Sequence, residues 1–366
     1  MGGEAEEGPQ IVTVDPRHLR RYGLLAGYFF LSLYVMTVFT IGQGFGLGID
    51  RVERIMHGGA PRPVPYRMLV PTLSRIGIAL VPGSVEERMR PLLISIRDSE
   101  PGRLIVAQRY KGEGHPPNLQ DERIVETAVV TVIIYAFLLA FIAMLHRLAR
   151  EVIPGSPAFA ATAPLVALFW LPVFCANWAY SYDFAELFFS CACIFLLHRR
   201  QWLAYLVTFG LATVNKETSL FLLVFYLAWM WGRLPVRRYL QLGAAQLVVY
   251  AAIKGAITLH FADVPGEIMA TAHSRQLAHM LGAYGFESAV AMIVVVCLTT
   301  WKWRTKPEFL RTGLWMLVPN GLAYFAGSNP GEYRSFYWSL PVVILLVTHT
   351  LVGAAGFLER SSADRA

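Results

Sequence analysis

The sequence predicts an all-α fold: a polytopic transmembrane bundle of about ten spans with a long first outer loop. Three observations support this prediction. Hydrophobic residues make up 55% of the 366 residues, only 16% are charged, and the mean hydropathy is +0.46. Apolar segments long enough to cross a bilayer recur along the chain. Lys and Arg are concentrated in alternate connecting segments. A soluble domain has a less apolar composition, so the chain is predicted to be a membrane protein.

The predicted spans follow one another with short connections, except after the first. They lie near 24–43, 128–146, 160–178, 183–198, 202–214, 218–232, 240–259, 286–301, 312–327 and 338–357. No small-residue cleavage site follows a short apolar core at the N-terminus, so we expect the first span to remain as an anchor. Four cysteines lie in or beside apolar runs without CxxC spacing, which argues against a disulfide framework and a zinc site.

The basic residues predict the orientation. With a cytoplasmic N-terminus, sixteen of the 32 Lys and Arg residues fall in inner segments, and the short outer segments hold only Lys216, Lys254, Arg275 and Arg334. The net charge of +7 therefore reflects topology, and no nucleic-acid partner is expected. We predict a cytoplasmic tail over 1–23, a transmembrane domain over 24–358 that includes the outer loop 44–127, and a cytoplasmic tail over 359–366.

The first outer loop contains two different pieces. The segment "PYRMLVPTLSRIGIAL" has apolar residues at helical spacing, and Arg67 and Arg75 fall roughly on one face of it. It is too short and too charged to span, so we expect a helix lying in the membrane interface. The following piece, from "SVEERMR" to "NLQDER", is mixed in charge and is expected to cap the outer face.

Ionisable residues gather in the outer segments, whereas the middles of the spans are almost free of charge. The outer set is Asp50, Glu53, Asp183, Glu186, Lys216, Glu217, Asp263, Glu267, Glu332 and Arg334. A charged group facing hydrocarbon is costly, so groups at helix ends need partners or water. We therefore predict a wet, charged cavity at the outer interface.

Each motif also has an ordinary structural explanation. Asp50 fits a turn or a helix cap, and Asp183 with Glu186 fits a capping pair. Lys216 and Glu217 are adjacent and fit a surface turn, with Thr218 capping the next span. The "GEYRSFYW" segment fits an interfacial aromatic belt. Four independent turns on one side all pair acids with aromatic or basic residues. Separate structural explanations for all four are less expected than one such explanation for a single turn.

The motifs resemble those of a known superfamily. An acid after the first span, "PYRMLVP", "YDFAELFF", "NKETSLF" and "GEYRSFYWSLP" are together similar to uncharacterised bacterial members of the GT-C glycosyltransferases. The resemblance covers most of the chain as a layout. It implies a multi-pass enzyme of the inner (plasma) membrane, and the distribution of Lys and Arg predicts that both termini are cytoplasmic. Such an enzyme takes a sugar from a polyprenyl-phosphate carrier, and amphipathic helices of its first outer loop cover the lipid-carrier site.

The resemblance also assigns the acid of that loop as catalytic. Asp50 occupies this position, but Arg51 follows it and the next acid is Glu53, where many members have two adjacent acids. Which of Asp50 and Glu53 is the base therefore stays open. Whether a divalent cation such as Mg²⁺ or Mn²⁺ is needed also stays open.

The chemistry that the resemblance implies suits these residue types. A carboxylate takes the acceptor proton, and cations stabilise the leaving phosphate. Lys216, Arg334 and Arg67 are candidate phosphate ligands, with Glu217 and Glu332 holding those cations. Asp183 and Glu186 are candidates for sugar hydroxyls or a metal, Tyr66 joins the substrate-binding set, and Trp178, Tyr180 and Tyr182 are candidates for stacking on a sugar. The sugar and the acceptor, which could be an envelope glycan, lipid or protein, stay unassigned.

Two other function classes remain. A transporter or flippase of a lipid-linked or anionic substrate would also need a charged cavity, but would place ionisable groups or broken helices near the bilayer midplane. The other class is a non-catalytic assembly or acyl-transfer component of envelope synthesis. An acyltransferase would show a His or Ser beside an acid, and His57, His115 and His273 form no such pair in the sequence.

Overall fold

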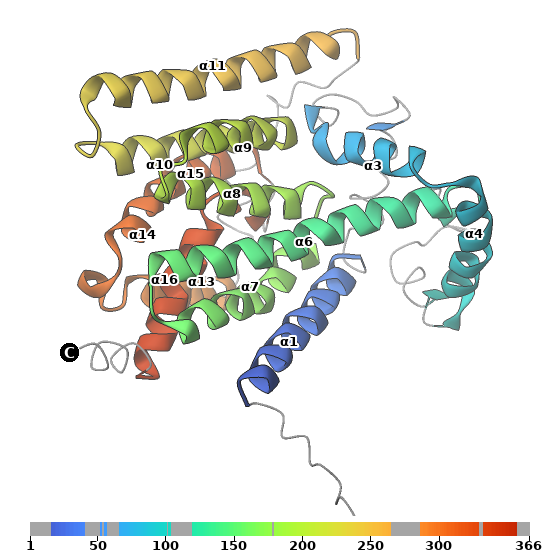
Figure 1. Cartoon of the computed structure of the whole chain (residues 1–366), viewed down its shortest axis with the longest axis horizontal. Helices are drawn as coiled ribbons and strands as arrows, with labels where there is room; N and C mark the ends of the chain where they lie inside the picture. Colours follow the sequence, from blue (N-terminus) through green and yellow to red (C-terminus); the bar gives the residue numbers. More distant parts are fainter. Residues whose placement is uncertain are drawn as a thin grey trace, which may run out of the picture.

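The computed structural model of the chain is all-helical in the part that it describes (Figure 1). The described residues are 16–40, 52, 55–56, 66–100, 102–103, 119–177, 179–264, 286–328 and 332–356. The longer helices are α1 (Pro16–Phe39), α3 (Leu69–Ala79), α4 (Gly83–Asp98), α6 (Ile124–Val152), α7 (Pro157–Asn177), α8 (Asp183–His198), α9 (Trp202–Asn215), α10 (Phe221–Met230), α11 (Val236–His260), α13 (Phe286–Thr300), α15 (Leu317–Gly327) and α16 (Leu340–Ala354). Short helical turns join them: η4 (Glu217–Leu220), η6 (Trp303–Thr305), α14 (Glu308–Gly313), η7 (Leu314–Met316) and η8 (Tyr333–Phe336).

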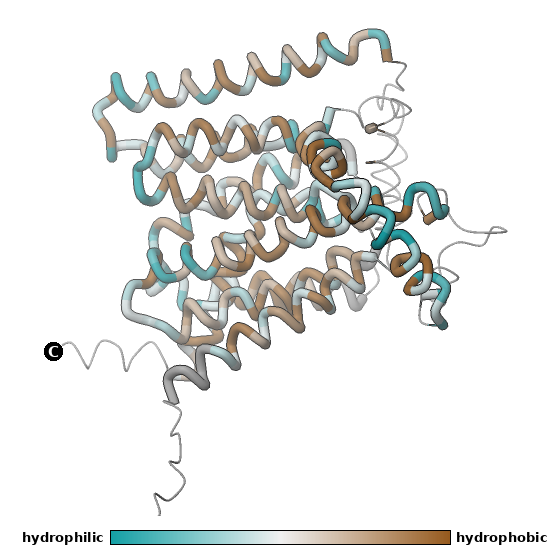
Figure 2. Tube along the Cα trace, turned by 45° about the vertical axis from the view of Figure 1, so that its right-hand side comes forward, coloured by the Kyte–Doolittle hydropathy of each residue, from teal (hydrophilic) through white to brown (hydrophobic). Residues whose placement is uncertain are grey.

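The long helices lie side by side in a bundle, and α3 and α4 lie together at one end of it (Figure 1). We call this end the α3 end and the other the opposite end. In Figure 2 hydrophobic residues follow the length of the bundled helices, whereas hydrophilic residues gather at the turns and on α4. This distribution is typical of helices whose middle portions face hydrocarbon.

Within the described ranges, four helices are long and apolar enough to cross a membrane. They span Tyr22–Phe39, Ile124–Val152, Pro157–Cys175 and Val236–His260. Large apolar side chains such as Leu203 and Leu259 are also exposed on the outside of the bundle, where lipid would cover them. The predicted all-α fold is therefore confirmed for the described residues, and the four long apolar helices support the predicted membrane location. Helices occupy each predicted apolar segment, but the count of about ten spans stays a prediction.

The core is built around α8, which is buried along almost its whole length. Its residues are apolar on every side, as expected of a helix surrounded by others. It packs between α6 and α9 and also meets α10 and α16. The first residues of this central helix include two acids, Asp183 and Glu186, and both are fully buried. Burial of charge at the end of the core helix needs partners, and these come from other segments.

The first outer loop of the sequence analysis supplies α3 and α4, and both pack against α6. A Cβ atom at Gly77 would lie 2.9 Å from Val129 Cγ1, so the glycine allows α3 to approach α6 closely. Arg97 of α4 donates to Leu119 O at 2.7 Å and to Asp121 Oδ1 at 2.6 Å. These contacts hold α4 at the end of the bundle, and Arg67, just before α3, contacts Tyr182 at the start of α8. Whether α3 lies in a membrane interface stays a prediction.

Candidate functional site

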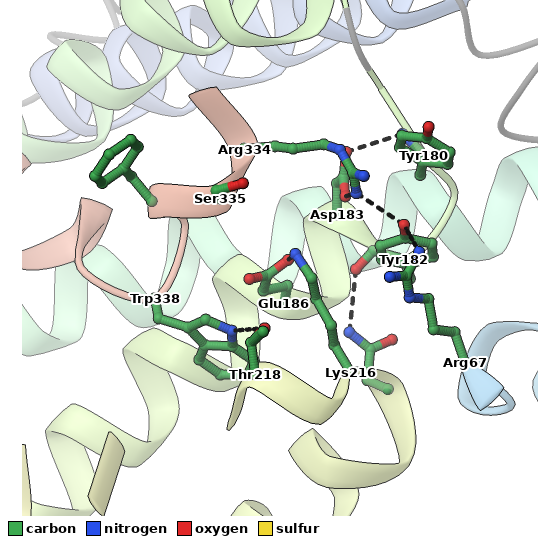
Figure 3. A network of polar contacts seen from close by, with 12 residues as sticks. Arg67, Tyr180, Tyr182, Asp183, Glu186, Lys216, Thr218, Arg334, Ser335 and Trp338 are labelled. Carbon is green, nitrogen blue, oxygen red and sulfur yellow. Dashed lines mark hydrogen bonds and ion pairs between the residues drawn. The ribbon is translucent and has the colours of Figure 1, made fainter. Parts of the chain in front are cut away.

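Four separate segments of the chain bring polar side chains together at the α3 end (Figure 3). We call this set the charge network; its members are Arg67, Tyr182, Asp183, Glu186, Lys216, Glu217, Glu332 and Arg334. They come from the segment before α3, the start of α8, the turn between α9 and α10, and η8 before α16. The predicted substrate-binding residues of these four motifs therefore lie in one place, apart from Tyr66.

The start of α8 directs two acids into the network. Tyr180 N–H donates to Asp183 Oδ2 at 2.8 Å, so the Asp183 carboxylate closes the turn that precedes α8. Glu186 lies three residues on, on the same face of the helix. It does not complete a capping pair: Lys216 Nζ donates to Glu186 Oε2 at 2.7 Å. The N-cap residue of α8 is Tyr182 and no side chain caps the helix, so the predicted capping pair is wrong for both acids.

Lys216 enters the network because the helical conformation of α9 ends at Asn215. The backbone of Lys216 is extended, with φ −159° and ψ 134°, and its side chain turns inward until only 6% of the residue is exposed. Asn215 Nδ2 donates to Tyr182 O at 3.1 Å, which ties this turn to the start of α8. Thr218 accepts a hydrogen bond from Trp338 Nε1 at 2.7 Å. The surface-turn explanation of this motif is therefore wrong.

Arg67 is the partner of Glu217. Arg67 Nη2 donates to Glu217 Oε1 at 3.3 Å. Burial alone would raise the pKa of Glu217, but the charge of Arg67 and a backbone hydrogen bond lower it to about 2. Glu217 is therefore ionised at neutral pH. Arg75, predicted to share a helix face with Arg67, donates instead to the carbonyl groups of Ile55 and Met56.

Arg334 closes the network from the other side. It donates to Glu332 Oε1 and, at 2.7 Å, to the Tyr182 hydroxyl oxygen. Its Nη1 lies 3.5 Å from Asp183 Oδ1, and its guanidinium carbon lies 3.7 Å from the centre of the Tyr180 ring. A planar guanidinium can stack on a ring and still use its edge for hydrogen bonds. Arg334 is therefore held in a fixed orientation.

Tyr182 is the centre of the network, a role that the sequence analysis did not predict. Both Arg67 and Arg334 donate to its hydroxyl oxygen. Burial raises the pKa of Tyr182 although both guanidinium charges act to lower it, so the hydroxyl keeps its proton. The guanidinium carbon of Arg67 and the ammonium nitrogen of Lys216 also lie over its ring, at 4.4 and 5.8 Å from the ring centre. Tyr182 thus holds three cations close together, which a sequence motif does not reveal.

Several buried atoms of the network lack a hydrogen-bond partner among the described residues. The unpartnered donors are Arg67 Nε and Arg334 Nε, and the unpartnered acceptors are Asp183 Oδ1, Glu186 Oε1, Asn215 Oδ1 and Glu217 Oε2. Buried polar groups are normally satisfied by protein or water. A cluster of free donors beside free acceptors therefore points to water or a ligand with both acceptor and donor groups.

The network carries no large excess of positive charge. Three cations face four acids: Arg67, Lys216 and Arg334 against Asp183, Glu186, Glu217 and Glu332. Each cation is held by an acid, so an anion would be recognised by the directions of the remaining N–H groups rather than by net charge. This arrangement favours a ligand that matches a defined pattern of donors and acceptors.

Asp50 and Glu53, predicted as catalytic, lie outside the described residues, as do Trp178, Glu267 and the three histidines His57, His115 and His273. The chain does leave α1 beside the network, because the Phe39 ring lies 5.2 Å from that of Phe184. Tyr66 is described but points to α11 rather than into the network. Asp263 is exposed.

Within the described part of the chain, no group of three or more His, Cys, Asp and Glu side chains is arranged to hold a metal ion. The comparisons with protein-family models, with curated proteins and with solved structures gave no match. The fold and the site therefore define an α-helical membrane protein with a buried charge network, and its chemistry has to be derived from its own residues.

Proposed function

We propose that the protein is an integral-membrane glycosyltransferase of the GT-C type, which moves a sugar from a polyprenyl-phosphate carrier to an outer-face acceptor. One observation carries this proposal: buried guanidinium N–H donors and buried carboxylate acceptors are left unpartnered in the same network. A phosphate group accepts hydrogen bonds, and sugar hydroxyls donate them. A sugar phosphate satisfies both kinds of free atom at once.

The network supports transfer chemistry at the phosphate. As the bond between the anomeric carbon and the phosphate oxygen breaks, negative charge grows on the leaving phosphate, and Arg67 and Arg334 stabilise it. Lys216 stays paired with Glu186 and orients that acid. The free oxygens of Asp183, Glu186 and Glu217 accept hydrogen bonds from sugar hydroxyls. In this proposal Asp50, or Glu53 in its place, takes the proton of the acceptor hydroxyl that attacks the anomeric carbon.

Asp50→Asn tests the mechanism. Transfer from a panel of polyprenyl-phosphate sugars is measured with purified protein, with and without a chelator of divalent cations. We expect turnover to fall by about 100- to 10,000-fold while carrier affinity changes little, because only the proton acceptor is removed. Glu53→Gln is the matched control and should cost much less. If the large loss falls on Glu53, that residue is the base; a loss of only a few-fold in both contradicts the mechanism.

The proposal also requires the network to face the outer side of the inner membrane, with about ten spans and both termini cytoplasmic. Single cysteines test this orientation after Cys297, the exposed native cysteine, is replaced by serine. A membrane-impermeant reagent should label cysteines at 100, 263 and 329 in intact cells and spare those at 150, 236 and 305. The reverse pattern would contradict the orientation and the side of the active site.

Transport of an anionic or lipid-linked substrate is the competing function. A transporter is expected to place ionisable groups or broken helices near the midplane, whereas this network lies at helix ends. Reconstitution in vesicles separates the two functions: movement of a labelled lipid-linked sugar between leaflets without transfer of the sugar would favour transport.

A further inference from the structure

A second cationic position lies beside the charge network, on a different helix. Lys254 is on α11, six residues before the helix ends at His260, or about 9 Å along its axis. Helix α11 is apolar and long enough to span a membrane, and only its contacts with α9 and α10 join it closely to the bundle. A lysine at this depth on a lipid-facing helix needs a reason, since a charge there is costly.

The described partner of Lys254 is an aromatic ring rather than an acid. Its ammonium nitrogen lies 4.3 Å from the centre of the Tyr66 ring, and Tyr66 also contacts the ring of Phe261 at 6.2 Å. No acid of the described chain lies within ion-pair distance of Lys254. A cation–π contact of this kind is weaker than an ion pair and leaves ammonium hydrogens for another acceptor.

Tyr66 precedes Arg67 in the chain, but the two side chains point to different parts of the molecule. Arg67 reaches inward to Tyr182 and Glu217, whereas Tyr66 faces Lys254 on α11. The positive charge of Lys254 also helps to lower the pKa of Glu217, which shows that the ammonium group is electrostatically close to the network. The Tyr66–Lys254 contact therefore lies between the network and the lipid-facing helix.

We propose that the Lys254–Tyr66 pair is a lateral portal, where the phosphate group of a lipid in the bilayer is first bound before it reaches the guanidinium groups of Arg67 and Arg334. This inference rests on the proposed function, because it names the route of the lipid-linked donor to that site. The ligand chemistry is a phosphate monoester or diester on a long apolar chain. The ammonium group exchanges its ring contact for phosphate oxygens, while the chain stays in the bilayer beside α11.

The same helix offers a matched control. Arg238 of α11 also faces an aromatic ring, since its guanidinium carbon lies 6.0 Å from the centre of the Trp202 ring. It belongs to the opposite end of the helix, near its start at Val236. A substitution there removes a cation–π contact of the same kind but leaves the portal intact.

The experiment compares wild-type protein, Lys254→Met and Arg238→Met in nanodiscs of neutral phosphatidylcholine. The probes are polyprenyl monophosphate, delivered within the bilayer, and inorganic phosphate, delivered from water. We expect Lys254→Met to weaken binding of polyprenyl monophosphate by about tenfold, as for a lost charge-assisted hydrogen bond. Arg238→Met should bind as wild type does, and inorganic phosphate should not distinguish the three proteins. Lys254→Arg should restore most of the lipid affinity.

Each outcome supports or contradicts the portal or the proposed function. If Lys254→Met binds the lipid as tightly as Arg238→Met does, the portal is wrong while the proposed function stands. Equal loss of inorganic phosphate binding would make Lys254 a ligand of the network itself and overturn the portal. If wild-type protein binds no polyprenyl monophosphate, the proposed function fails and the portal with it. Methionine suits a lipid-facing helix, and matching thermal midpoints of the variants would exclude misfolding as the cause.

Discussion

Buried cations occur at both ends of the helical bundle, but their surroundings differ. At the α3 end, Lys216 and Arg334 meet acids, and several buried donors and acceptors of the network remain unpartnered. At the opposite end, Lys306 is 2% exposed, and its ammonium donates to Leu346 O at 2.6 Å and Thr350 Oγ1 at 2.7 Å. A third acceptor, Leu298 O, lies at 3.5 Å.

The difference distinguishes a lysine with a structural role, Lys306, from a candidate binding site, the charge network. Lys306 joins α13 to α16 through neutral acceptors, and its nitrogen has an acceptor for each of its three hydrogens. Nothing in that arrangement calls for a ligand. The network differs, because several of its buried donors and acceptors have no hydrogen-bond partner among the described residues. Loss of Lys306 should therefore change stability alone, and loss of a network cation should change stability and binding together.

Lys216→Met should have the largest effect. It leaves Glu186 buried without its cation, and removing one partner of a buried ion pair costs about 3–5 kcal/mol. We expect the free energy of unfolding to fall by that order and the turnover by at least about tenfold, as judged by urea titration in detergent and by the transfer assay.

The double variant Lys216→Met with Glu186→Gln is the control for this prediction. It removes both charges, so most of the stability should return, because no uncompensated charge remains. Turnover should stay low, since the acid that accepts a sugar hydroxyl is also lost. Full recovery of turnover in the double variant would show that the pair is as purely structural as Lys306.

The sequence predicted the general class of fold because composition and apolar periodicity alone indicate a helical membrane protein. It also predicted which motifs share one side of the bundle, because the helices alternate in direction along the chain. Glu217 and Glu332 were expected to hold cations, and they contact Arg67 and Arg334. The sequence did not show which acid pairs with which cation. Lys216 pairs with Glu186 rather than with a residue of its own motif, and Arg67 pairs with Glu217. Such contacts depend on where helices end, and a one-residue change in a helix end redirects a side chain.

Two features had no signal in the sequence. Tyr182 was one of several aromatic residues near a membrane boundary, and nothing in its motif marked it as the shared acceptor of two arginines. Lys306 was one of many basic residues assigned to inner segments, and only the packing of α13 against α16 buries it. Both roles arise from tertiary contacts between residues far apart in the chain.

Lys306→Met should have the second-largest effect, and it should affect stability alone. The side chain loses its hydrogen bonds to Leu346 and Thr350, which leaves a buried hydroxyl and carbonyl with one partner fewer. We expect a loss of about 1–3 kcal/mol in the free energy of unfolding. The transfer rate and the carrier affinity, measured below the unfolding temperature, should match those of wild type. A tenfold loss of turnover without a loss of stability would contradict the comparison.

Arg67→Lys should have a smaller effect, and on binding rather than stability. Lysine keeps the charge that Glu217 requires but loses the planar fork and the free Nε–H. Carrier affinity should fall by roughly tenfold, with little change in thermal midpoint. Arg97→Lys is the matched control: Arg97 is a similarly buried arginine whose Nε–H is already used, by Asp98 Oδ1 at 2.8 Å. It should not change carrier affinity.

A pH titration should show the smallest effect on stability, and it distinguishes the two ends of the bundle. Burial lowers the pKa of Lys306 from its usual 10.5 to about 8, so between these values the unfolded chain binds more protons than the folded one. Stability from this residue therefore rises with pH, on the order of 1 kcal/mol between pH 7 and pH 9. Glu217 contributes no change there, because its depressed pKa of about 2 places its loss of stability below pH 4.5. The thermal midpoint of wild type should thus rise relative to that of Lys306→Met across this range, whereas Arg67→Lys should follow wild type. A parallel course of wild type and Lys306→Met would show that Lys306 does not titrate near pH 8.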